Sequence, residues 1–467
     1  MYKIDFSKPC RIHFIGIGGI SMSGFAEYLH TLGFQISGSD AHKSTITDHL
    51  SALGIKFFLG QRAANISSDI DLVVYTAAIS EDNEELMEVR QRNIPILTRA
   101  EMIGQLMLNF GNSVAVSGTH GKTTTTSMLS SIFMAGDLDP TISVGGILDA
   151  IGGNIRIGKS EHFIIEACEY TNTFLQFNPR VGVILNIDED HLDFFKDLAD
   201  IRSSFHQFAK RLPQNGKLFI NGEIDQYEEI TTDLACEVFT YGIVDPRYRK
   251  TDKIYDYCAD NVVFNDHSIG SFDLYYRGEY LDRIQLNVIG LHNISNSLPA
   301  IAIALQVGVN LNTIKKALLS FSNSKRRFEY KGMIGGVTII DDYAHHPTEV
   351  LATLTAARNY PHKNLWCVFQ PHTYTRTKQH LTEFAEALSL VDKIVLTDIY
   401  AAREKDPGDI SSKDLARELE HLGKEVYYFQ SFDEVENYLL QNCMNGDLLI
   451  TMGAGDIVSV GENLLGL

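Results

Sequence analysis

The sequence predicts an α/β protein of three units, each built on a mostly parallel sheet. The chain has 467 residues, and domains average about 150 residues, so three units are expected. Short apolar runs with strand character alternate with helical patterns along most of the chain, the order typical of parallel sheets covered by helices. The apolar runs lead repeatedly into polar or glycine-rich loops. We expect the units to span residues 1–109, 110–323 and 324–467.

Composition limits the kinds of partner that the protein can bind. Hydrophobic residues make up 44% of the chain and charged residues 21%, the values of an ordinary globular protein. The formal net charge is −19, which argues against binding to nucleic acid or to anionic membrane surfaces. The six cysteines form no C-x-x-C pair, so neither a zinc knuckle nor a disulfide framework is indicated.

The chain also lacks the signals of secretion and membrane insertion. Residues 1–6 contain no apolar signal core, and no apolar run approaches the ~20 residues that span a bilayer. We therefore expect a cytoplasmic protein that does not insert into a membrane. Nothing in the sequence indicates the oligomeric state.

The first unit begins with a strand, a tight turn and a helix, which we assign to 11–15, 16–19 and 21–32. A second strand at 34–37 ends at Gly38-Ser39-Asp40. This alternation predicts a Rossmann-like domain whose ligand lies at the carboxyl ends of the strands. Candidate ligand contacts at those ends are Gly16, Gly18, Gly19, Ser39, Asp40 and Thr76.

The glycine-rich turn leaves two kinds of ligand open. Gly16-x-Gly18, with the acidic Asp40 after the second strand, matches part of the dinucleotide fingerprint G-x-G-x-x-G. Ser21 occupies the position of the third glycine. A partial fingerprint suits any diphosphate, so both NAD and another diphosphate-bearing ligand remain, and the second is favoured.

The second unit contains a phosphate-binding loop at 117–126. An apolar strand at 114–116 leads into this loop, and a helical pattern follows at 128–134. Backbone N–H groups, the positive helix end and the lysine of such a loop bind nucleotide phosphates, and the threonine after the lysine binds Mg²⁺. The usual G-x-x-x-x-G-K-[ST] spacing is shortened, because Val116 stands at the first glycine position. We predict an ATP site formed by Gly118, Thr119, His120, Gly121, Lys122, Thr123 and Thr124.

Acidic and histidine side chains follow two further strands of this unit. The strand predicted at 162–169 ends in carboxylates, and the strand at 181–187 leads into Asp188-Glu189-Asp190-His191. Carboxylates at strand ends beside a P-loop are where nucleotide hydrolases and transferases hold their metal. The candidate metal ligands are therefore Thr123, Glu166 and His191.

The remainder of the second unit combines β-rich and helical sequence. Residues 238–286 alternate aromatic and charged residues, which predicts an antiparallel appendage, and Gly145-Gly146 is predicted to lie in a loop. Asn293 and Asn296 stand one turn apart at the start of a helix that continues through 298–307. They can cap this helix or present their amides to a purine, and the sequence leaves both open.

The third unit repeats the pattern of apolar strands that lead into polar loops. These loops carry Asp341 to Pro347, Gln370 to Thr377, Thr397 to Ala402 and Met452 to Asp456. Such loops gather at the carboxyl edge of a parallel sheet, which predicts a second Rossmann-like domain with a site at that edge. The adjacent pair His345-His346 before proline has poor spacing for metal ligation, so no zinc site is predicted.

Several motifs in a fixed order resemble those of the Mur ligase family. They are Gly118–Thr124, Glu166-Ala167-Cys168-Glu169, Asp190-His191-Leu192-Asp193, His292-Asn293-x-x-Asn296, Arg326-Arg327-Phe328, Asp342–Pro347 and Gln370-Pro371-His372-x-Tyr374-x-Arg376-Thr377. Together with His13–Gly19 and Ser37–Asp40, they extend the resemblance over essentially the whole chain. The shortened Gly118-x-x-Gly121-Lys122-Thr123 is the form that this family uses.

The resemblance implies an ATP-dependent ligase of peptidoglycan precursor synthesis. In the implied reaction, the lactyl carboxylate of UDP-N-acetylmuramate attacks the γ-phosphate of ATP, and the amine of L-alanine then attacks the acyl phosphate. Mg²⁺, or Mn²⁺ in its place, offsets the charge repulsion. The first domain then binds UDP rather than NAD. The alternative is a sister ligase that adds a peptide or another amino acid to the same UDP-sugar, and an oxidoreductase or regulatory P-loop protein is the hypothesis from another class.

Carried over residue by residue, the resemblance also assigns roles. It implies that Lys122 binds the β- and γ-phosphates and that Arg376, with His345 beside it, pairs with the carboxylate of the incoming amino acid. The implied nucleotide contacts beyond the loop are Asn293, Asn296, Arg327 and Asp342. The implied catalytic set is Lys122, Glu166, His191, His345 and Arg376.

Some positions depart from the family pattern. Thr373 stands where many members carry arginine, and Lys325 replaces a common glycine. Cys168 and Tyr170 alter the Glu-Ala-Asp-Glu-Ser motif of many members. Amino-acid binding is therefore not carried over to Thr373. The base that accepts the amine proton, and any role of a modified lysine in metal binding, stay open.

Overall fold

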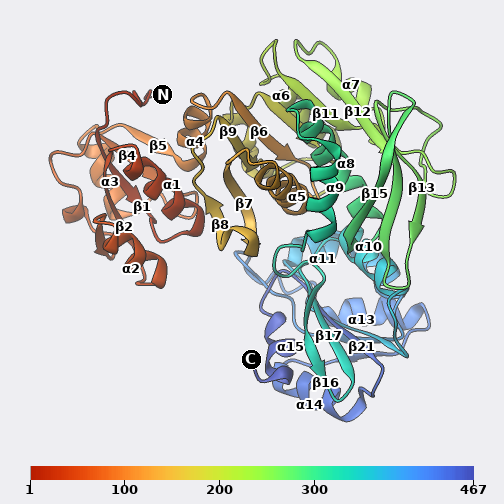
Figure 1. The fold of residues 1–467 in the computed structure, drawn as a ribbon. Coiled ribbons are helices and arrows are strands. Elements are labelled where there is room, and N and C mark those ends of the chain that lie inside the picture. Colours follow the sequence, from red (N-terminus) through yellow and green to blue (C-terminus); the bar gives the residue numbers. More distant parts are fainter. Residues whose placement is uncertain (1) are drawn as a thin grey trace.

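The computed structural model describes residues 2–467, which form three α/β units with one sheet each (Figure 1). In Figure 1 the N-terminal unit lies at the left in red and orange, the central unit at the top in yellow and green, and the C-terminal unit below in blue. The sheets have five, ten and six strands. The predicted class, a three-unit α/β protein with mostly parallel sheets, is confirmed.

The first sheet is entirely parallel, in the order β3-β2-β1-β4-β5. Its strands are β1 (Arg11–Ile15), β2 (Gln35–Asp40), β3 (Lys56–Leu59), β4 (Leu72–Tyr75) and β5 (Ile96–Thr98). Its helices are α1 (Ile20–Thr31), α2 (Thr45–Ala52), η1 (Ala63–Asn65), α3 (Glu84–Gln91) and α4 (Arg99–Met107). The strand order reverses between β1 and β4, so the 16–19 turn lies at a topological switch point, where open α/β sheets bind ligands.

The second strand of this sheet is longer than the sequence pattern predicts. β2 continues through Asp40, because Ser39 pairs with Ile15 of β1 and Asp40 pairs with Leu59 of β3. Glycine is needed within this strand, since a Cβ on Gly38 would lie 2.6 Å from the Cδ1 of Ile17. The pairing holds Asp40 at the carboxyl edge.

The second sheet has the order β15-β14-β13-β12-β11-β10-β6-β9-β7-β8. Its strands are β6 (Asn112–Ser117), β7 (Thr141–Leu148), β8 (Gly153–Arg156), β9 (His162–Glu166), β10 (Val181–Ile184), β11 (Lys217–Asn221), β12 (Glu237–Ile243), β13 (Tyr257–Phe264), β14 (Ile269–Tyr276) and β15 (Glu279–Ile289). The helices are α5 (Lys122–Ala135), η2 (Asp149–Ile151), η3 (Tyr170–Gln176), α6 (Leu198–Ala209), α7 (Tyr227–Thr231), α8 (Leu291–Gln306) and α9 (Leu311–Ser320).

The predicted β-rich appendage is continuous with this sheet. β12 pairs with β11 and β13 pairs with β12 in parallel, and within this region the antiparallel pairs are β13–β14 and β14–β15. The region 238–286 therefore extends the central sheet instead of forming a separate antiparallel layer. Its aromatic residues supply part of the core, with Tyr255, Tyr257 and Phe272 at most 2% exposed.

Gly145 and Gly146 lie within β7, so their prediction as loop residues is wrong. Glycine is needed at position 145 because of close packing and not because the chain turns there. A Cβ on Gly145 would lie 2.5 Å from Oε2 of Glu166, so the glycine leaves room for that carboxylate beside the strand.

The third sheet has the order β16-β17-β21-β18-β19-β20, and only the β16–β17 pair is antiparallel. Its strands are β16 (Glu329–Ile334), β17 (Val337–Asp342), β18 (Leu365–Phe369), β19 (Lys393–Leu396), β20 (Val426–Tyr428) and β21 (Leu448–Met452). The helices are α10 (Pro347–Ala357), α11 (Tyr374–Gln379), α12 (Leu381–Leu388), α13 (Ser412–His421), α14 (Phe432–Asn442) and α15 (Val458–Leu465).

The first and second units share one apolar core. A single cluster of buried side chains runs from Phe25 of α1 to Phe163 of β9, whose rings lie 6.3 Å apart. α4 also packs on η3, and Asn178 donates a hydrogen bond of 2.9 Å to the carbonyl of Gly104. Within the part of the chain that the structure describes, no helix has the length and apolar character needed to cross a bilayer.

Candidate active site

The phosphate-binding loop connects β6 to α5 and depends on two glycines with positive φ. Gly118 has φ of 140° and Gly121 has φ of 82°, conformations that other residues rarely adopt. A Cβ on Gly121 would also lie 2.4 Å from Oδ1 of Asn296. Asn186 braces the loop from the next strand, because its side chain accepts the N–H of His120 at 2.7 Å and donates to the His120 carbonyl at 3.0 Å.

Lys122 is held by a carboxylate that the sequence did not single out. Its Nζ lies 3.0 Å from Oε2 of Glu169 and also donates to the carbonyls of Gly118 and Thr119. Burial alone would lower the pKa of Lys122, but Glu169, together with Cys168 and Glu166, outweighs burial and raises it. The lysine is therefore a permanent cation at the mouth of the loop, as phosphate binding requires.

Glu166 has the surroundings expected of a metal ligand. Its Oε1 is buried and has no hydrogen-bond partner among residues 2–467, while the Thr123 hydroxyl and the Gly145 N–H lie beside the carboxylate. Burial raises the pKa of this carboxyl. An orphaned buried oxygen next to the threonine of a P-loop fits a hard divalent cation with oxygen ligands, so these residues suit Mg²⁺.

His191 lies on the other side of Glu169. Its Nε2 is 3.9 Å from Oε1 of Glu169, its ring packs 4.6 Å from that of Tyr170, and its φ of 56° is left-handed. Burial lowers the pKa of His191, which favours the neutral imidazole that metals bind. The structure brings His191 next to the Lys122–Glu169 pair.

The two asparagines of α8 do not cap the helix, so that alternative is excluded. The helix begins at Leu291 with Gly290 as N-cap and no side-chain cap bond. Asn293 instead donates to the carbonyl of Ile289 at 2.8 Å, and Asn296 donates to Oδ1 of Asn293 at 3.2 Å. Both are buried, and Asn296 packs against Gly121 of the loop, which leaves the nucleotide-contact hypothesis in place.

His120 joins the loop to the third unit. Its Nε2 lies 3.4 Å from Oδ2 of Asp188, and its Nδ1 lies 3.3 Å from Oε1 of Glu349 on α10. Burial alone would lower the pKa of His120, but the two carboxylates outweigh it and raise the pKa to about 9. The side chain is therefore an imidazolium that bridges two units at neutral pH.

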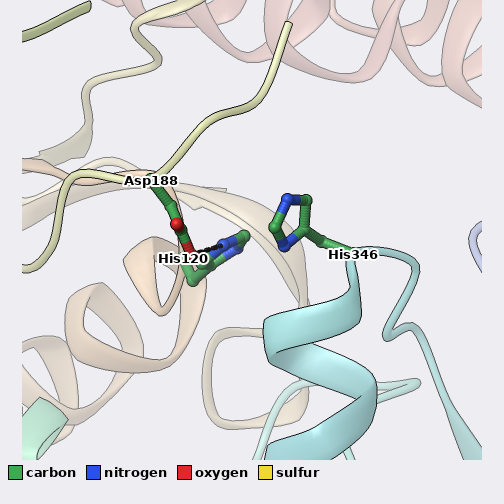
Figure 2. Close-up of side chains that lie close together, drawn as sticks. All are labelled: His120, Asp188 and His346. Atoms are coloured by element: carbon green, nitrogen blue, oxygen red, sulfur yellow. Dashed lines mark ion pairs between the residues drawn. The ribbon is translucent and has the colours of Figure 1, made fainter. Parts of the chain in front are cut away.

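The group His120, Asp188 and His346 has ligand atoms within 4.8 Å of one another (Figure 2). In Figure 2 the dashed line joins His120 to Asp188, and His346 approaches from the start of α10. Both nitrogens of His346 are already engaged, because Nε2 lies 3.0 Å from the Glu189 carbonyl and Nδ1 accepts the Thr348 N–H at 3.3 Å. We interpret the group as an ion-pair cluster and not as a metal site.

Arg376 forms a buried ion pair with Asp190, a residue that the sequence pattern did not indicate as its partner. Its Nε and Nη2 lie 3.1 and 2.8 Å from Oδ1 of Asp190, and its Nη1 lies 3.1 Å from Nδ1 of His372. Arg376 and Asp190 are both 9% exposed. The predicted pairing of Arg376 with an amino-acid carboxylate therefore requires the guanidinium to be shared with Asp190.

His345 shares the carboxylate of Glu349 with His120. Its Nδ1 lies 2.9 Å from the Tyr343 carbonyl and 3.4 Å from Oε2 of Glu349. Burial lowers the pKa of His345 to about 4, so the ring is neutral. With Nδ1–H donated to the carbonyl, Nε2 keeps a free lone pair.

Arg327 and Asp342 lie in the same region but differ in exposure. Arg327 is 3.9 Å from Glu349 and packs over the ring of Tyr343. Asp342 is buried and accepts the N–H groups of Phe328 and Ala344, each at 2.8 Å. Burial raises the pKa of Asp342 to about 6, and these bonds hold the backbone on both sides of the site.

The predicted pocket of the first unit is assembled in part. Asp40 accepts the Gly18 N–H at 2.9 Å, and Thr76 lies against Gly16, whose added Cβ would be 2.8 Å from Cγ2 of Thr76. Gly19 follows in the turn as the N-cap of α1. The side chain of Ser39 does not face this pocket: it is fully buried and donates to Glu85 at 2.5 Å.

The residues that sequence reasoning missed are those that join the motifs together: Glu169, Asn186, Asp188, Asp190, His346 and Glu349. Four of them, Glu169, Asp188, Asp190 and His346, stand within or next to motifs of the family pattern, for example in Asp188-Glu189-Asp190-His191. The excess of acidic residues in that loop was the available signal. Their partners are distant in the chain, however, and several lie in another unit, so no local sequence pattern identifies them.

A phosphate-binding loop, a carboxylate with an orphaned oxygen and converging loops from a second sheet define a nucleotide-binding α/β enzyme. Family models match residues 11–111 (Mur ligase family, catalytic domain), 116–304 (Mur ligase middle domain) and 326–455 (Mur ligase, glutamate ligase domain). The chain belongs to the Mur ligase family.

Individual relatives match over the full length. The chain is 60% identical over 468 residues to the UDP-N-acetylmuramate–L-alanine ligase of Lachnoclostridium phytofermentans and 56% identical over 465 residues to that of Agathobacter rectalis, covering 100% of each chain. It resembles the crystal structure of UDP-N-acetylmuramate-alanine ligase from Thermotoga maritima, with a TM-score of 0.78, 28% identity and coverage of 98% of both chains.

Proposed function

We propose that this protein is an ADP-forming ligase that joins L-alanine to the lactyl carboxylate of UDP-N-acetylmuramate, a step of peptidoglycan precursor synthesis. The observation that carries the proposal is full-length identity of 60% to a ligase of that name, combined with an assembled phosphate-binding loop. The proposed domains are 1–109 for the UDP-sugar, 110–323 for ATP, and 324–467 for amino-acid and nucleotide contacts.

The chemistry begins with activation of a carboxylate. A free carboxylate is a poor acyl donor to an amine, so the lactyl oxygen first attacks the γ-phosphate of ATP, which gives an acyl phosphate and ADP. Lys122 and the N–H groups at the start of α5 hold the phosphates. Glu169 keeps Lys122 charged and fixed in position at 3.0 Å, so the cation is already oriented before the phosphates bind.

A divalent cation is the remaining part of this half of the site. Thr123, Glu166 and His191 are the residues that would hold Mg²⁺, or Mn²⁺ in its place. When bound, such an ion offsets the repulsion between the carboxylate and the triphosphate. Asn293, Asn296, Arg327 and Asp342 are proposed nucleotide contacts around it.

The second half of the reaction needs an unprotonated amine. We assign the amino-acid end of the site to His345 and Arg376, which approach the Asp188–His191 loop from the third domain. The neutral His345 ring, with a free lone pair on Nε2, is suited to accept a hydrogen bond from the amine. Attack on the acyl carbon then expels phosphate. We assign the reaction to the cytoplasm, where ATP and UDP-sugars are available.

The test is ADP release by the full chain with UDP-N-acetylmuramate and a panel of amines. We expect release only when UDP-sugar and L-alanine are both present, with glycine, L-serine and a tripeptide much slower. Faster turnover with the tripeptide would show instead a sister ligase that attaches a preformed peptide. ADP release that is independent of any UDP-sugar would overturn the proposal altogether.

A further inference from the structure

Arg99 is a guanidinium without a counter-ion at the junction of the first two domains. It is half-buried, and among residues 2–467 it takes part in no side-chain hydrogen bond, ion pair or cation–π contact. Burial lowers its pKa, and the one group that acts in the opposite direction is the thiol of Cys168, whose own pKa is raised by burial; no carboxylate contributes. Arginines shielded from water are normally paired, so this one is open to an anion.

The position of Arg99 is set by the first sheet. β5 pairs with β4 so that Thr98 lies opposite Tyr75, and Arg99 and Thr76 therefore each follow their strand directly at the same carboxyl edge. Thr76 in turn contacts Gly16 of the glycine-rich turn. The N-terminus of α4 is itself satisfied, because Thr98 and Glu101 form a capping box. It is the side chain, and not the helix end, that lacks a partner.

The opposite side of Arg99 is the ATP-binding domain. Its neighbour Cys168 directly precedes Glu169, the carboxylate that holds Lys122. α4 is locked onto η3, since a Cβ on Gly104 would lie 1.8 Å from the carbonyl oxygen of Gln176. Arg99 therefore stands between the turn assigned to the UDP diphosphate and the loop assigned to the γ-phosphate.

We propose that Arg99 binds the lactyl carboxylate of the UDP-sugar, an inference that rests on the proposed function. In the proposed complex, the Gly16–Gly19 turn and the start of α1 bind the diphosphate, and Lys122 binds the triphosphate. The reacting carboxylate must lie between them, beside the negative side chains Glu166 and Glu169. A cation from the first domain offsets that repulsion and orients one carboxylate oxygen for attack.

The test compares two nucleotides that differ in the carboxylate. Calorimetric titration, without ATP, measures binding of UDP-N-acetylmuramate and of UDP-N-acetylglucosamine, which lacks the lactyl group, to the full chain and to Arg99→Gln, Arg99→Lys and the control Arg90→Gln. Arg90 is exposed in the same domain. We expect Arg99→Gln to weaken UDP-N-acetylmuramate binding by about 10- to 100-fold and UDP-N-acetylglucosamine binding by less than about twofold, with partial recovery in Arg99→Lys.

Each other outcome has a defined meaning. Equal weakening of both nucleotides overturns the inference, because Arg99 would then serve the diphosphate. Unchanged binding of both in Arg99→Gln overturns it as well. If Arg99→Gln does not fold by circular dichroism, Arg99→Lys decides: it should discriminate less than the wild type, and wild-type discrimination between the nucleotides in that variant overturns the inference. A wild-type chain that fails to bind UDP-N-acetylmuramate overturns the proposed function, a result distinct from failure of the Arg99 assignment alone.

Discussion

The guanidinium of Arg376 lies 2.8 and 3.1 Å from a single carboxylate oxygen of Asp190, across the boundary between the second and third domains. The same acidic loop is contacted by His346 at Glu189 and by Thr348 at Asp188. The loop that carries His191 is thus positioned by the C-terminal domain. Movement of that domain would move the proposed metal ligand with it.

The Arg376–Asp190 pair is expected to stabilise the domain boundary. Asp190→Asn leaves a buried guanidinium without its charge partner, so the free energy of unfolding should fall by about 3 kcal/mol. Urea denaturation measures the change. The control Asp409→Asn removes an exposed ion pair with Lys378, which lies on α11 together with Arg376. Such exposed pairs contribute less than about 1 kcal/mol. Equal small effects in both variants would contradict this role.

Lys122 should be needed for catalysis and not for UDP-sugar binding. Lys122→Ala removes the cation beside the phosphates, so we expect ADP release to fall by about 10³-fold or more. Calorimetry should show UDP-N-acetylmuramate affinity unchanged within about threefold. Lys159→Ala, which alters an exposed lysine of the same domain, is the control. Loss of UDP-sugar binding in a folded Lys122→Ala chain would refute the division of labour between domains.

Glu166 is expected to lower the free energy of unfolding of the ligand-free chain and to contribute to Mg²⁺ binding. Its folded-state pKa is raised by burial, so the ionised carboxylate destabilises the fold above its ordinary pKa. Glu166→Gln should therefore raise the stability of the ligand-free chain by about 1 kcal/mol. The same change should raise the Mg²⁺ concentration for half-maximal ADP release by about tenfold or more. Glu161→Gln, just before the other end of β9, should change neither quantity.

The raised pKa of His120 predicts that the stability of the chain depends on pH. Its pKa is raised to about 9 in the folded chain by Asp188 and Glu349 despite burial. A raised pKa contributes stability that is fully present below about pH 6.5 and is lost as the pH rises through about 9. The stability difference between wild type and His120→Asn should shrink over that range, from at most about 3 kcal/mol. The exposed His267→Asn should show no such slope, and a constant wild-type difference would count against the bridge.

Substitution of Gly104 tests how rigidly α4 of the first domain packs on η3 of the second. Gly104→Ala forces a methyl group to within 1.8 Å of the Gln176 carbonyl oxygen, and we expect a loss of about 3 kcal/mol in unfolding free energy. Gly153→Ala is the matched control, because nothing lies within 4 Å of its added Cβ. A Gly104→Ala chain with unchanged denaturation would mean that α4 and η3 separate easily.

Local patterns were sufficient for much of the fold. The alternation of strand and helix signals predicted three mostly parallel sheets, and the Gly118–Thr124 spacing predicted the glycine-rich loop with its flanking strand and helix. Glycines were less informative. The sequence places Gly145 in a loop and Gly38 at the end of a strand, yet both lie within strands, because a neighbouring side chain occupies the space where a Cβ would stand. Only the packed structure contains that neighbour.

The sequence by itself determined the fold class, the family and the position of the glycine-rich loop proposed to bind phosphate, because these depend on residues close together in the chain. The tertiary structure decided which charges meet. It paired Lys122 with Glu169, Arg376 with Asp190, and His120 with both Asp188 and Glu349, and it left Arg99 without a partner. Ion pairs between residues far apart in the chain depend on distances across the fold, and no spacing along the chain encodes them.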